Sequence, residues 1–290
     1  MTAIEFTLQS PLKRVITLIK SFTADARHFQ IIYLLSFLIY GLIELKWEIG
    51  YDQIFVVMGA ALSTQFLWLK ITGGKMSGLK SAMITGLGLC LLLKSASLMT
   101  LGIAATLAIS SKFVLKIKNK HLFNPANFGI IISIIVLQDA WISPGQWGSS
   151  ALFLFVLSVF GGIVLLKIGR LETSLVFIGS LFVMEYIRTV LYQGWEMDVL
   201  FHKFSSGTLL LFTFFMITDP MTIPNSKKAR MIWALVLATA TFILSNWMQI
   251  YTAPIWVLFF MTPLTVFLDK IYPQLKFEWN QPTSTKHIVN

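Results

Sequence analysis

Apolar residues form long runs along almost the whole chain, and polar residues gather in the short stretches between these runs. An α-helix crosses the roughly 30 Å hydrocarbon core of a bilayer in about 20 residues. Judged against that length, the pattern predicts ten membrane-spanning helices. Their ranges are 29–44, 53–69, 79–93, 96–114, 123–138, 149–167, 172–192, 205–219, 231–249 and 253–269.

The composition supports this prediction. The chain is 56% hydrophobic and 12% charged, with a mean hydropathy of +0.75, whereas soluble domains carry about 25% charged residues. We therefore predict an all-α polytopic membrane protein whose surroundings are the lipid bilayer. A net charge of +10 would suggest nucleic acid in a soluble protein. Basic cytoplasmic loops explain this charge instead, and we expect no nucleic-acid partner.

The basic residues also give an orientation. With the N-terminus placed in the cytoplasm, 19 of the 23 Lys and Arg residues fall on the cytoplasmic side. The four on the other side are Lys46, Lys94, Arg188 and Lys203. Because cytoplasmic loops of membrane proteins are enriched in Lys and Arg, we predict that both termini are cytoplasmic.

Two flanking segments lie outside the ten spans. Residues 1–28 carry basic residues but no apolar region typical of a cleavable signal peptide. Their PLKRVITLIKSF stretch places apolar residues near one helical face, which predicts an amphipathic helix on the inner leaflet. The alternative is a disordered basic lead. Residues 270–290 form a mixed polar cytoplasmic tail to which we assign no structure.

The ten spans divide into two sets of five, residues 29–139 and 149–269. An odd number of spans per half gives the halves opposite orientations, which is the inverted-repeat plan of many transporters. The third and eighth spans are the short ones, at roughly 20 Å each by the rise of an α-helix. Short spans at matching positions indicate a site near the membrane midplane. The alternative is that both helices tilt less or begin within their flanking loops.

Two Pro-containing breaks lie near membrane depth. Asn124 followed by Pro125 is typical of a helix start, because Asn caps free N–H groups and Pro fits the first helical position. Asp219 followed by Pro220 has the same form. A carboxylate is favourable at a helix N-terminus and unfavourable at a C-terminus. Both places therefore predict broken helices whose exposed ends face protein or a wet cavity.

Several kinds of chemistry have no support in the sequence. A single cysteine, Cys90, cannot form an internal disulfide or hold an iron–sulfur cluster or structural zinc. The four histidines lie near span ends or in the tail, so a bis-His haem is not expected. No nucleotide-binding or hydrolase motif is present. We predict no catalytic or metal-binding residues, and whether the chain is an enzyme stays open.

FNPANFG at 123–129 and SGTLLLFTFFMITDPMTIP at 206–224 resemble the signature stretches of the RnfD/NqrB family. These proteins are membrane subunits of ion-translocating NADH–ferredoxin and NADH–quinone oxidoreductases. The resemblance covers roughly residues 120–232. It implies a urea-transporter-like fold of ten spans in two inverted halves, a bacterial cytoplasmic (inner) membrane, other membrane redox subunits as partners, and flavin.

One departure from the family concerns covalent flavin. The resemblance implies FMN esterified to a threonine in a Ser/Thr-Gly-Ala-Thr motif between the two signature stretches. The only threonines between Phe123 and Gly207 are Thr173 and Thr189, and neither follows Gly-Ala. Covalent FMN is therefore not expected. We expect a non-covalent flavin instead, either FMN or riboflavin. The chain resembles free-standing or enediyne-cluster-type RnfD-like proteins more than a standard pump subunit.

The two signature stretches supply the candidate cofactor-binding residues. They are Asn124, Pro125, Asn127, Ser206, Gly207, Thr208, Thr218, Asp219, Pro220 and Thr222. Asn124 has an alternative role as a helix cap alone. The alternative role of Asp219 is that of an ion-pair partner of the basic residues at 227–230. Glu185 and Arg188 share a helical face on the seventh span and form a candidate ion pair.

Two functions follow from these observations. The first is flavin-associated transmembrane electron transfer with a non-covalent flavin. The second is transport of a small solute, flavin itself included, through the same inverted fold, and a membrane scaffold is a weaker third. Release of free flavin on denaturation, seen in the absorbance spectrum, would distinguish the electron-transfer function from the transport and scaffold functions.

Overall fold

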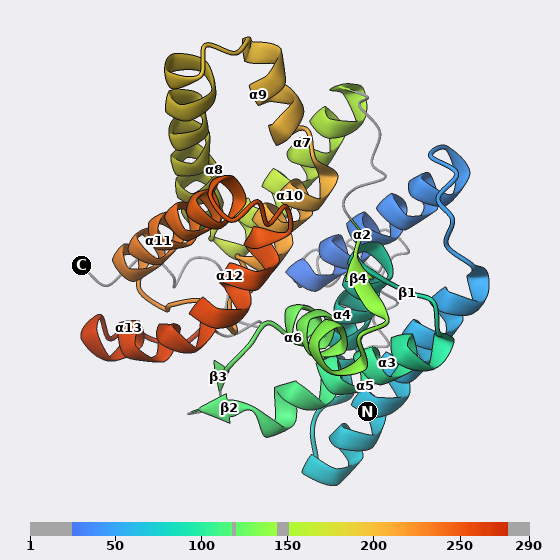
Figure 1. Cartoon of the computed structure of the whole chain (residues 1–290). Helices are drawn as coiled ribbons and strands as arrows, with labels where there is room; N and C mark the ends of the chain where they lie inside the picture. Colours follow the sequence, from blue (N-terminus) through green and yellow to red (C-terminus); the bar gives the residue numbers. More distant parts are fainter. Residues whose placement is uncertain (1–24, 118–119, 144–150, 278–290) are drawn as a thin grey trace, which may run out of the picture.

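The computed structural model describes residues 25–117, 120–143 and 151–277 (Figure 1). The described chain is mostly helical. The predicted N-terminal amphipathic helix and most of the polar tail lie outside these residues. The first part of the chain contains α2 Ala26–Ile43, α3 Tyr51–Thr72, α4 Leu79–Leu92, α5 Leu98–Val114 and α6 Pro125–Ile132. The second contains α7 Ala151–Ile168, α8 Leu171–Tyr186, α9 Met197–Phe204, α10 Gly207–Leu211, α11 Lys227–Asn246, α12 Ala253–Met261 and α13 Thr265–Ile271.

Shorter elements extend or interrupt these helices. Three π-helical segments continue α6, α8 and α10, namely η2 Ser133–Leu137, η3 Ile187–Tyr192 and η4 Phe212–Met216. Two 3₁₀ turns are η1 Met76–Gly78 and η5 Thr262–Leu264. Four short strands are β1 Leu93–Ser95, β2 Lys116–Ile117, β3 Lys120–His121 and β4 Ala140–Ile142.

Five helices of the described chain are long and apolar enough to cross a membrane. They are α2, α3, α8 with η3, α11, and α12 with α13. A sixth is formed if α9 and α10 with η4, which bend by 55° at their junction, count as one broken span. Shorter apolar helical segments lie at 76–92, 98–114, 125–137 and, within α7, at 158–168. The protein is therefore a multi-pass membrane protein, while its ten-span, inverted-repeat arrangement stays a prediction.

The short third and eighth spans have clear ends. The third, α4, ends where Leu93 turns into the extended β1. The eighth consists of α10 and η4, which run only from Gly207 to Met216. Its preceding residues form the separate helix α9, so the chain is broken there rather than continuous.

The strands are an addition to the predicted all-α fold. β1 pairs with β4 and β2 pairs with β3, both antiparallel. These segments lie next to helix ends, where backbone N–H and C=O groups would lack partners, and pairing satisfies them. Segments of two or three residues are too short to show the alternating pattern of a strand, so the sequence could not predict them.

The two parts of the chain share a core. Figure 1 shows α2 to α6 on one side of the molecule and α8 to α13 on the other, and α7 packs against α2. One cluster of buried apolar residues includes members of both parts, among them Ala108, Ile130, Phe212 and Trp233. Many large apolar side chains are exposed, such as Phe55 and Ile71 on α3. Such a surface is expected where lipid tails, rather than water, are the solvent.

Candidate functional site

A cavity of about 270 Å³ lies where the two parts of the chain meet. Its walls come from α2, α3, α4, α5, β3 and α6 in the first part, and from α10, η4 and the following segment in the second. Residues from helix ends, such as Arg27, Ser81 and Lys112, make one region of the wall polar. Residues farther along the same helices, such as Leu34 and Leu91, make another region apolar. The cavity therefore suits a ligand with both polar and apolar parts.

Both predicted chain breaks line this cavity. Asn124 caps α6, since its Oδ1 accepts the backbone N–H of Asn127 at 3.1 Å and Pro125 takes the first helical position. Asp219 forms a turn in which its Oδ1 accepts the N–H of Met221 at 3.0 Å. The N–H of His121 donates to the Met221 carbonyl at 3.2 Å. The two breaks, far apart in sequence, are thus held together.

Two oppositely charged residues face the cavity without pairing directly. The Lys112 side chain belongs to a residue only 6% exposed, and its Nζ donates to the carbonyl and hydroxyl of Ser81 at 3.2 and 3.3 Å. Asp219 lines the same cavity, but none of the ion pairs within 4.0 Å between described residues joins it to Lys112.

The other cation in the cavity wall is held by a carboxylate. The Arg27 guanidinium bonds to Asp25 at 2.8 to 3.2 Å, and Lys80 reaches the same carboxylate at 2.9 Å. Burial by itself would raise the pKa of Asp25, but the Arg27 and Lys80 bonds outweigh it and hold the pKa below its usual range. Asp25 therefore stays ionised and balances the charge of Arg27.

Two polar atoms at this cavity have no hydrogen-bond partner among the described residues. They are Gln65 Oε1 and His121 Nδ1, and both residues line the cavity. Burial lowers the pKa of His121 to about 4, so its ring is neutral near pH 7. An unsatisfied buried polar atom costs about 1–3 kcal/mol. A polar ligand in the cavity would supply the missing bonds.

Aromatic rings supply flat apolar walls. Phe113 lies in the wall and stacks on Trp68, with ring centroids 5.1 Å apart and 6° between the planes. Phe215 also lies in the wall and stacks on Tyr33 at 5.1 Å and 30°. Phe212, by contrast, is fully buried against Phe177. The cavity can accommodate a planar ring system beside Phe113 and Phe215.

The structure divides the predicted site residues into two groups. Asn124, Pro125, Asp219 and Pro220 line the cavity. Asn127 is fully buried near them, and both its amide atoms lack a partner among the described residues.

The remaining predicted residues are not in the cavity wall. Ser206 caps α10 through Leu209 N–H, and Gly207 is the first residue of that helix. Thr208, Thr218 and Thr222 each donate a hydroxyl to a backbone carbonyl, of Ser143, Phe214 and Asp219 respectively. These bonds are local or structural, so the five residues contribute to the shape of the chain around the site.

The structure also decides between the alternative ion-pair roles. The basic residue Arg230 pairs with Glu172 rather than Asp219, and its guanidinium also donates to the Asn225 carbonyl at 2.5 Å. The expected Glu185–Arg188 pair is absent from the described residues. Glu185 accepts from Lys203 at 2.6 Å and from Asn246 at 2.8 Å, and Arg188 donates to Gln193 at 3.1 Å.

Sequence reasoning missed the polar residues that come from apolar helices. In the charge pattern, Lys112 counts only as one of the basic residues on the cytoplasmic side. Gln65 lies within an apolar run. The available signal was the rule that a polar residue within a membrane helix is costly and often functional. The two threonines between the signature stretches, Thr173 and Thr189, are buried at 0% and 4% exposure, and neither lines the cavity.

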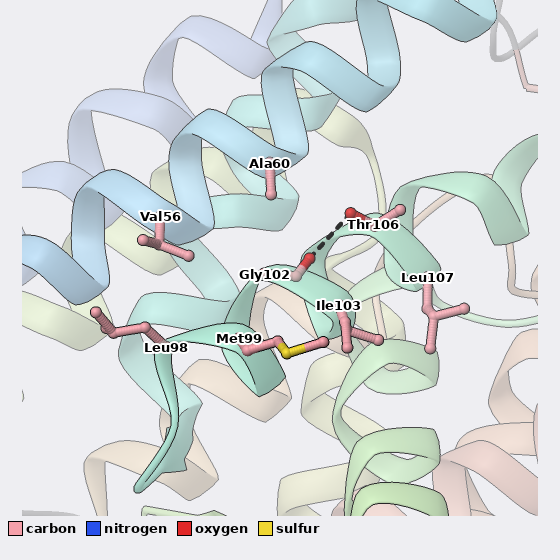
Figure 2. A pocket seen from close by; sticks show the side chains of 8 residues that line it. All are labelled: Val56, Ala60, Leu98, Met99, Gly102, Ile103, Thr106 and Leu107. Atoms are coloured by element: carbon pink, nitrogen blue, oxygen red, sulfur yellow. Dashed lines mark hydrogen bonds between the residues drawn. The ribbon is translucent and has the colours of Figure 1, made fainter.

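A second, larger space has different chemistry. Figure 2 shows a pocket of about 520 Å³ between α3 and α5, lined by residues such as Val56, Ala60 and Ile103. Its one hydroxyl, that of Thr106, already donates to the Gly102 carbonyl at 2.9 Å. No polar group of this lining is left to orient a ligand, so the smaller cavity between the chain breaks is the better candidate site.

The fold defines a multi-pass membrane protein with a broken helix and an internal cavity. The family model for NQR2, RnfD, RnfE matches residues 133–278, which is half of the chain. The protein therefore belongs to the NQR2, RnfD, RnfE family. The match includes the 206–224 stretch and begins just after the FNPANFG stretch at 123–129.

Two relatives agree with this assignment. In Vibrio vulnificus strains YJ016 and CMCP6, each is the D component of an ion-translocating oxidoreductase complex. Each is 32% identical over 89 residues, which is 30% of this chain and 25% of the relative. The aligned part thus spans about a quarter of the length of the relatives.

Proposed function

We propose that this protein is a membrane subunit of an RnfD/NqrB-type electron-transfer system and holds a non-covalent flavin, FMN or riboflavin. The observation that carries the proposal is the cavity between the two chain breaks, with unsatisfied polar atoms at Gln65 and His121 and aromatic walls at Phe113 and Phe215. Family membership supports a redox role, and the relatives are named as subunits of an oxidoreductase complex.

The proposed arrangement has ten spans in two inverted halves. Each of the ten predicted spans overlaps an apolar helix of the described chain, and several of these helices are shorter than a full crossing. Short helices are tolerated where they face protein or a cavity, as α4 and α10 do at this site. The distribution of Lys and Arg supports cytoplasmic termini, and the family supports a bacterial inner membrane.

The residues of the cavity fit a flavin. Phe113 and Phe215 would bound the ring system, while Asn124, Gln65 and His121 would offer hydrogen bonds to its polar atoms. When bound, a flavin supplies the capacity to accept and release electrons. The chain's own contribution is to bind and orient the ring between its two halves and to exclude water from the apolar region of the cavity. Other membrane redox subunits would then be its partners.

An absorbance spectrum of the detergent-purified protein, taken before and after denaturation, tests this proposal. We expect a flavin spectrum and release of free flavin on denaturation. Gly88→Phe should abolish flavin binding, because Gly88 lines the cavity and the larger side chain would fill it. A Cβ at this position is 3.7 Å from the Ala126 Cβ. Gly179→Phe is the matched control, since it is an exposed helical glycine with nothing within 4 Å of an added Cβ.

The competing function is transport of a small solute through the same fold. Protein without flavin, together with solute flux in liposomes, would replace the redox proposal with this one. Flavin retained by the Gly88→Phe variant would place the cofactor outside the cavity.

A further inference from the structure

We infer that Lys112 and Asp219 together recognise one edge of the ligand, an edge that presents a hydrogen-bond acceptor beside an N–H donor. In the flavin ring system this is the imide edge, where an N–H lies between two carbonyl groups. The inference rests on the proposed flavin function and adds two specificity-determining residues to it.

The first observation is the incomplete bonding of Lys112. An ammonium group has three N–H donors, and its two hydrogen bonds to described residues both go to Ser81, a neutral residue. The residue is buried, and a buried charge without an opposite charge beside it is strongly unfavourable. A ligand oxygen with partial negative charge, facing the cavity, would relieve this cost.

The second observation is the position of Asp219 in the same cavity wall. Its Oδ1 is used by the Met221 N–H, and its carboxylate is more than 4.0 Å from the Lys112 ammonium, beyond the limit of an ion pair. The two groups therefore bracket a space instead of closing it. A ligand that accepts from Lys112 and donates to Asp219 would fill that space.

The charges also argue against an anionic group here. Arg27, the other cation of the wall, is already balanced by Asp25. The opposite charge that acts on Lys112 is that of Asp219, which lies across the cavity and does not pair with it directly. A phosphate at this edge would meet the Asp219 carboxylate, whereas a neutral imide matches both groups. These two residues are thus expected to bind the edge of the ring and not a phosphate.

The test compares lumiflavin with 3-methyllumiflavin, which lacks the imide N–H, by quenching of their fluorescence on titration with purified protein. We expect the wild-type protein to bind lumiflavin at least about tenfold more tightly, because a hydrogen bond to a charged group is lost with the methyl derivative. Asp219→Asn should abolish this preference. The asparagine side chain keeps an oxygen that can accept the Met221 N–H. Its other atom is an NH₂ group, a donor, which cannot accept the imide N–H of the ligand.

Lys112→Met should weaken both ligands to a similar extent and keep the preference between them. Lys116→Met is the matched control, an exposed lysine four residues away, and should change neither affinity. Thermal unfolding of each variant shows whether it is folded.

The outcomes separate the two proposals. Failure of the wild-type protein to bind either compound would overturn the flavin proposal itself. Equal binding of both compounds by the wild-type protein would overturn the inference and leave flavin binding in place, and this arm requires no variant to fold. A preference that survives in Asp219→Asn would also overturn it.

Discussion

Gly129 is a residue near the site at which two helices pack closely. A Cβ placed there would lie 2.7 Å from the Ala104 carbonyl oxygen and 2.8 Å from the Ala108 Cβ. These contacts join α6, which Asn124 caps, to α5, which ends at Val114, two residues after Lys112. We expect Gly129→Ala to push the two helices apart and to lower the free energy of unfolding by about 1–3 kcal/mol, as overpacking of a core does.

Thermal unfolding in detergent measures this effect. Gly179→Ala is the control, because an added Cβ there has nothing within 4 Å, and its melting temperature should stay close to that of the wild-type protein. Equal losses in both variants would show that helix flexibility, and not close packing at Gly129, is responsible.

Single residues differ in how far the sequence can predict their roles. The cap at Asn124 was predictable because its partner, Asn127 N–H, is three residues away and capping is a local rule. The role of Lys112 was not, because its neighbours Ser81 and Asp219 come from distant parts of the chain. A site formed between two halves depends on such distant pairs.

At the level of elements, the start of α6 is the feature most open to test. Asn124→Ala removes the oxygen that accepts Asn127 N–H and should lower the free energy of unfolding by about 1 kcal/mol. Asn124→Asp keeps an acceptor and places a negative charge at a helix N-terminus, where it is favourable. Only the alanine variant should therefore increase amide exchange in the first turn of α6, as measured by hydrogen–deuterium exchange mass spectrometry.

If Asn124→Asp lowered the free energy of unfolding as much as Asn124→Ala does, loss of the cap could not be the cause. The Asn124 amide also donates to the Met216 carbonyl at 3.5 Å, and both variants lack that donor. In that case the contact with η4, and not the cap, would hold the start of α6.

Helices were predictable and their irregular ends were not. The span predicted at 79–93 is the helix Leu79–Leu92, because an apolar run of helical length leaves the backbone few other ways to bond in a membrane. The π-helical turns at 187–192 and 212–216 and the β1–β4 pairing have no counterpart in a hydropathy pattern. They depend on how helix ends pack against other parts of the fold.

At the scale of the whole molecule, one carboxylate near the end of the last helix joins the parts of the site. Asp269 on α13 accepts the N–H of Asn225 at 2.8 Å through Oδ1, and Lys120 Nζ through Oδ2. Lys120 precedes the Asn124 break, and Asn225 follows the Asp219 break. Both breaks and their separate caps were predictable from local sequence. The connection through Asp269, at the end of the tenth predicted span, was not, because it joins residues far apart in the chain.

This connection gives a prediction about assembly of the cavity. Lys120 and Asp269 have side chains only 9% and 17% exposed, and breaking a buried ion pair costs about 3–5 kcal/mol. Lys120→Gln should therefore lower the free energy of unfolding by about 3 kcal/mol, toward the low end of that range because Asp269 retains some exposure. It should also weaken flavin binding, since the two chain breaks that line the cavity lose their common anchor.

Lys203→Gln is the matched comparison. It breaks the Glu185–Lys203 ion pair, whose residues do not line the cavity, so it should lower stability and leave flavin affinity unchanged. A double-mutant cycle of Lys120→Gln with Asp269→Asn should be strongly non-additive, because the two changes remove one interaction. Flavin affinity reduced equally by Lys203→Gln and Lys120→Gln would mean that the cavity responds to overall stability, and that Asp269 does not specifically hold the two breaks together.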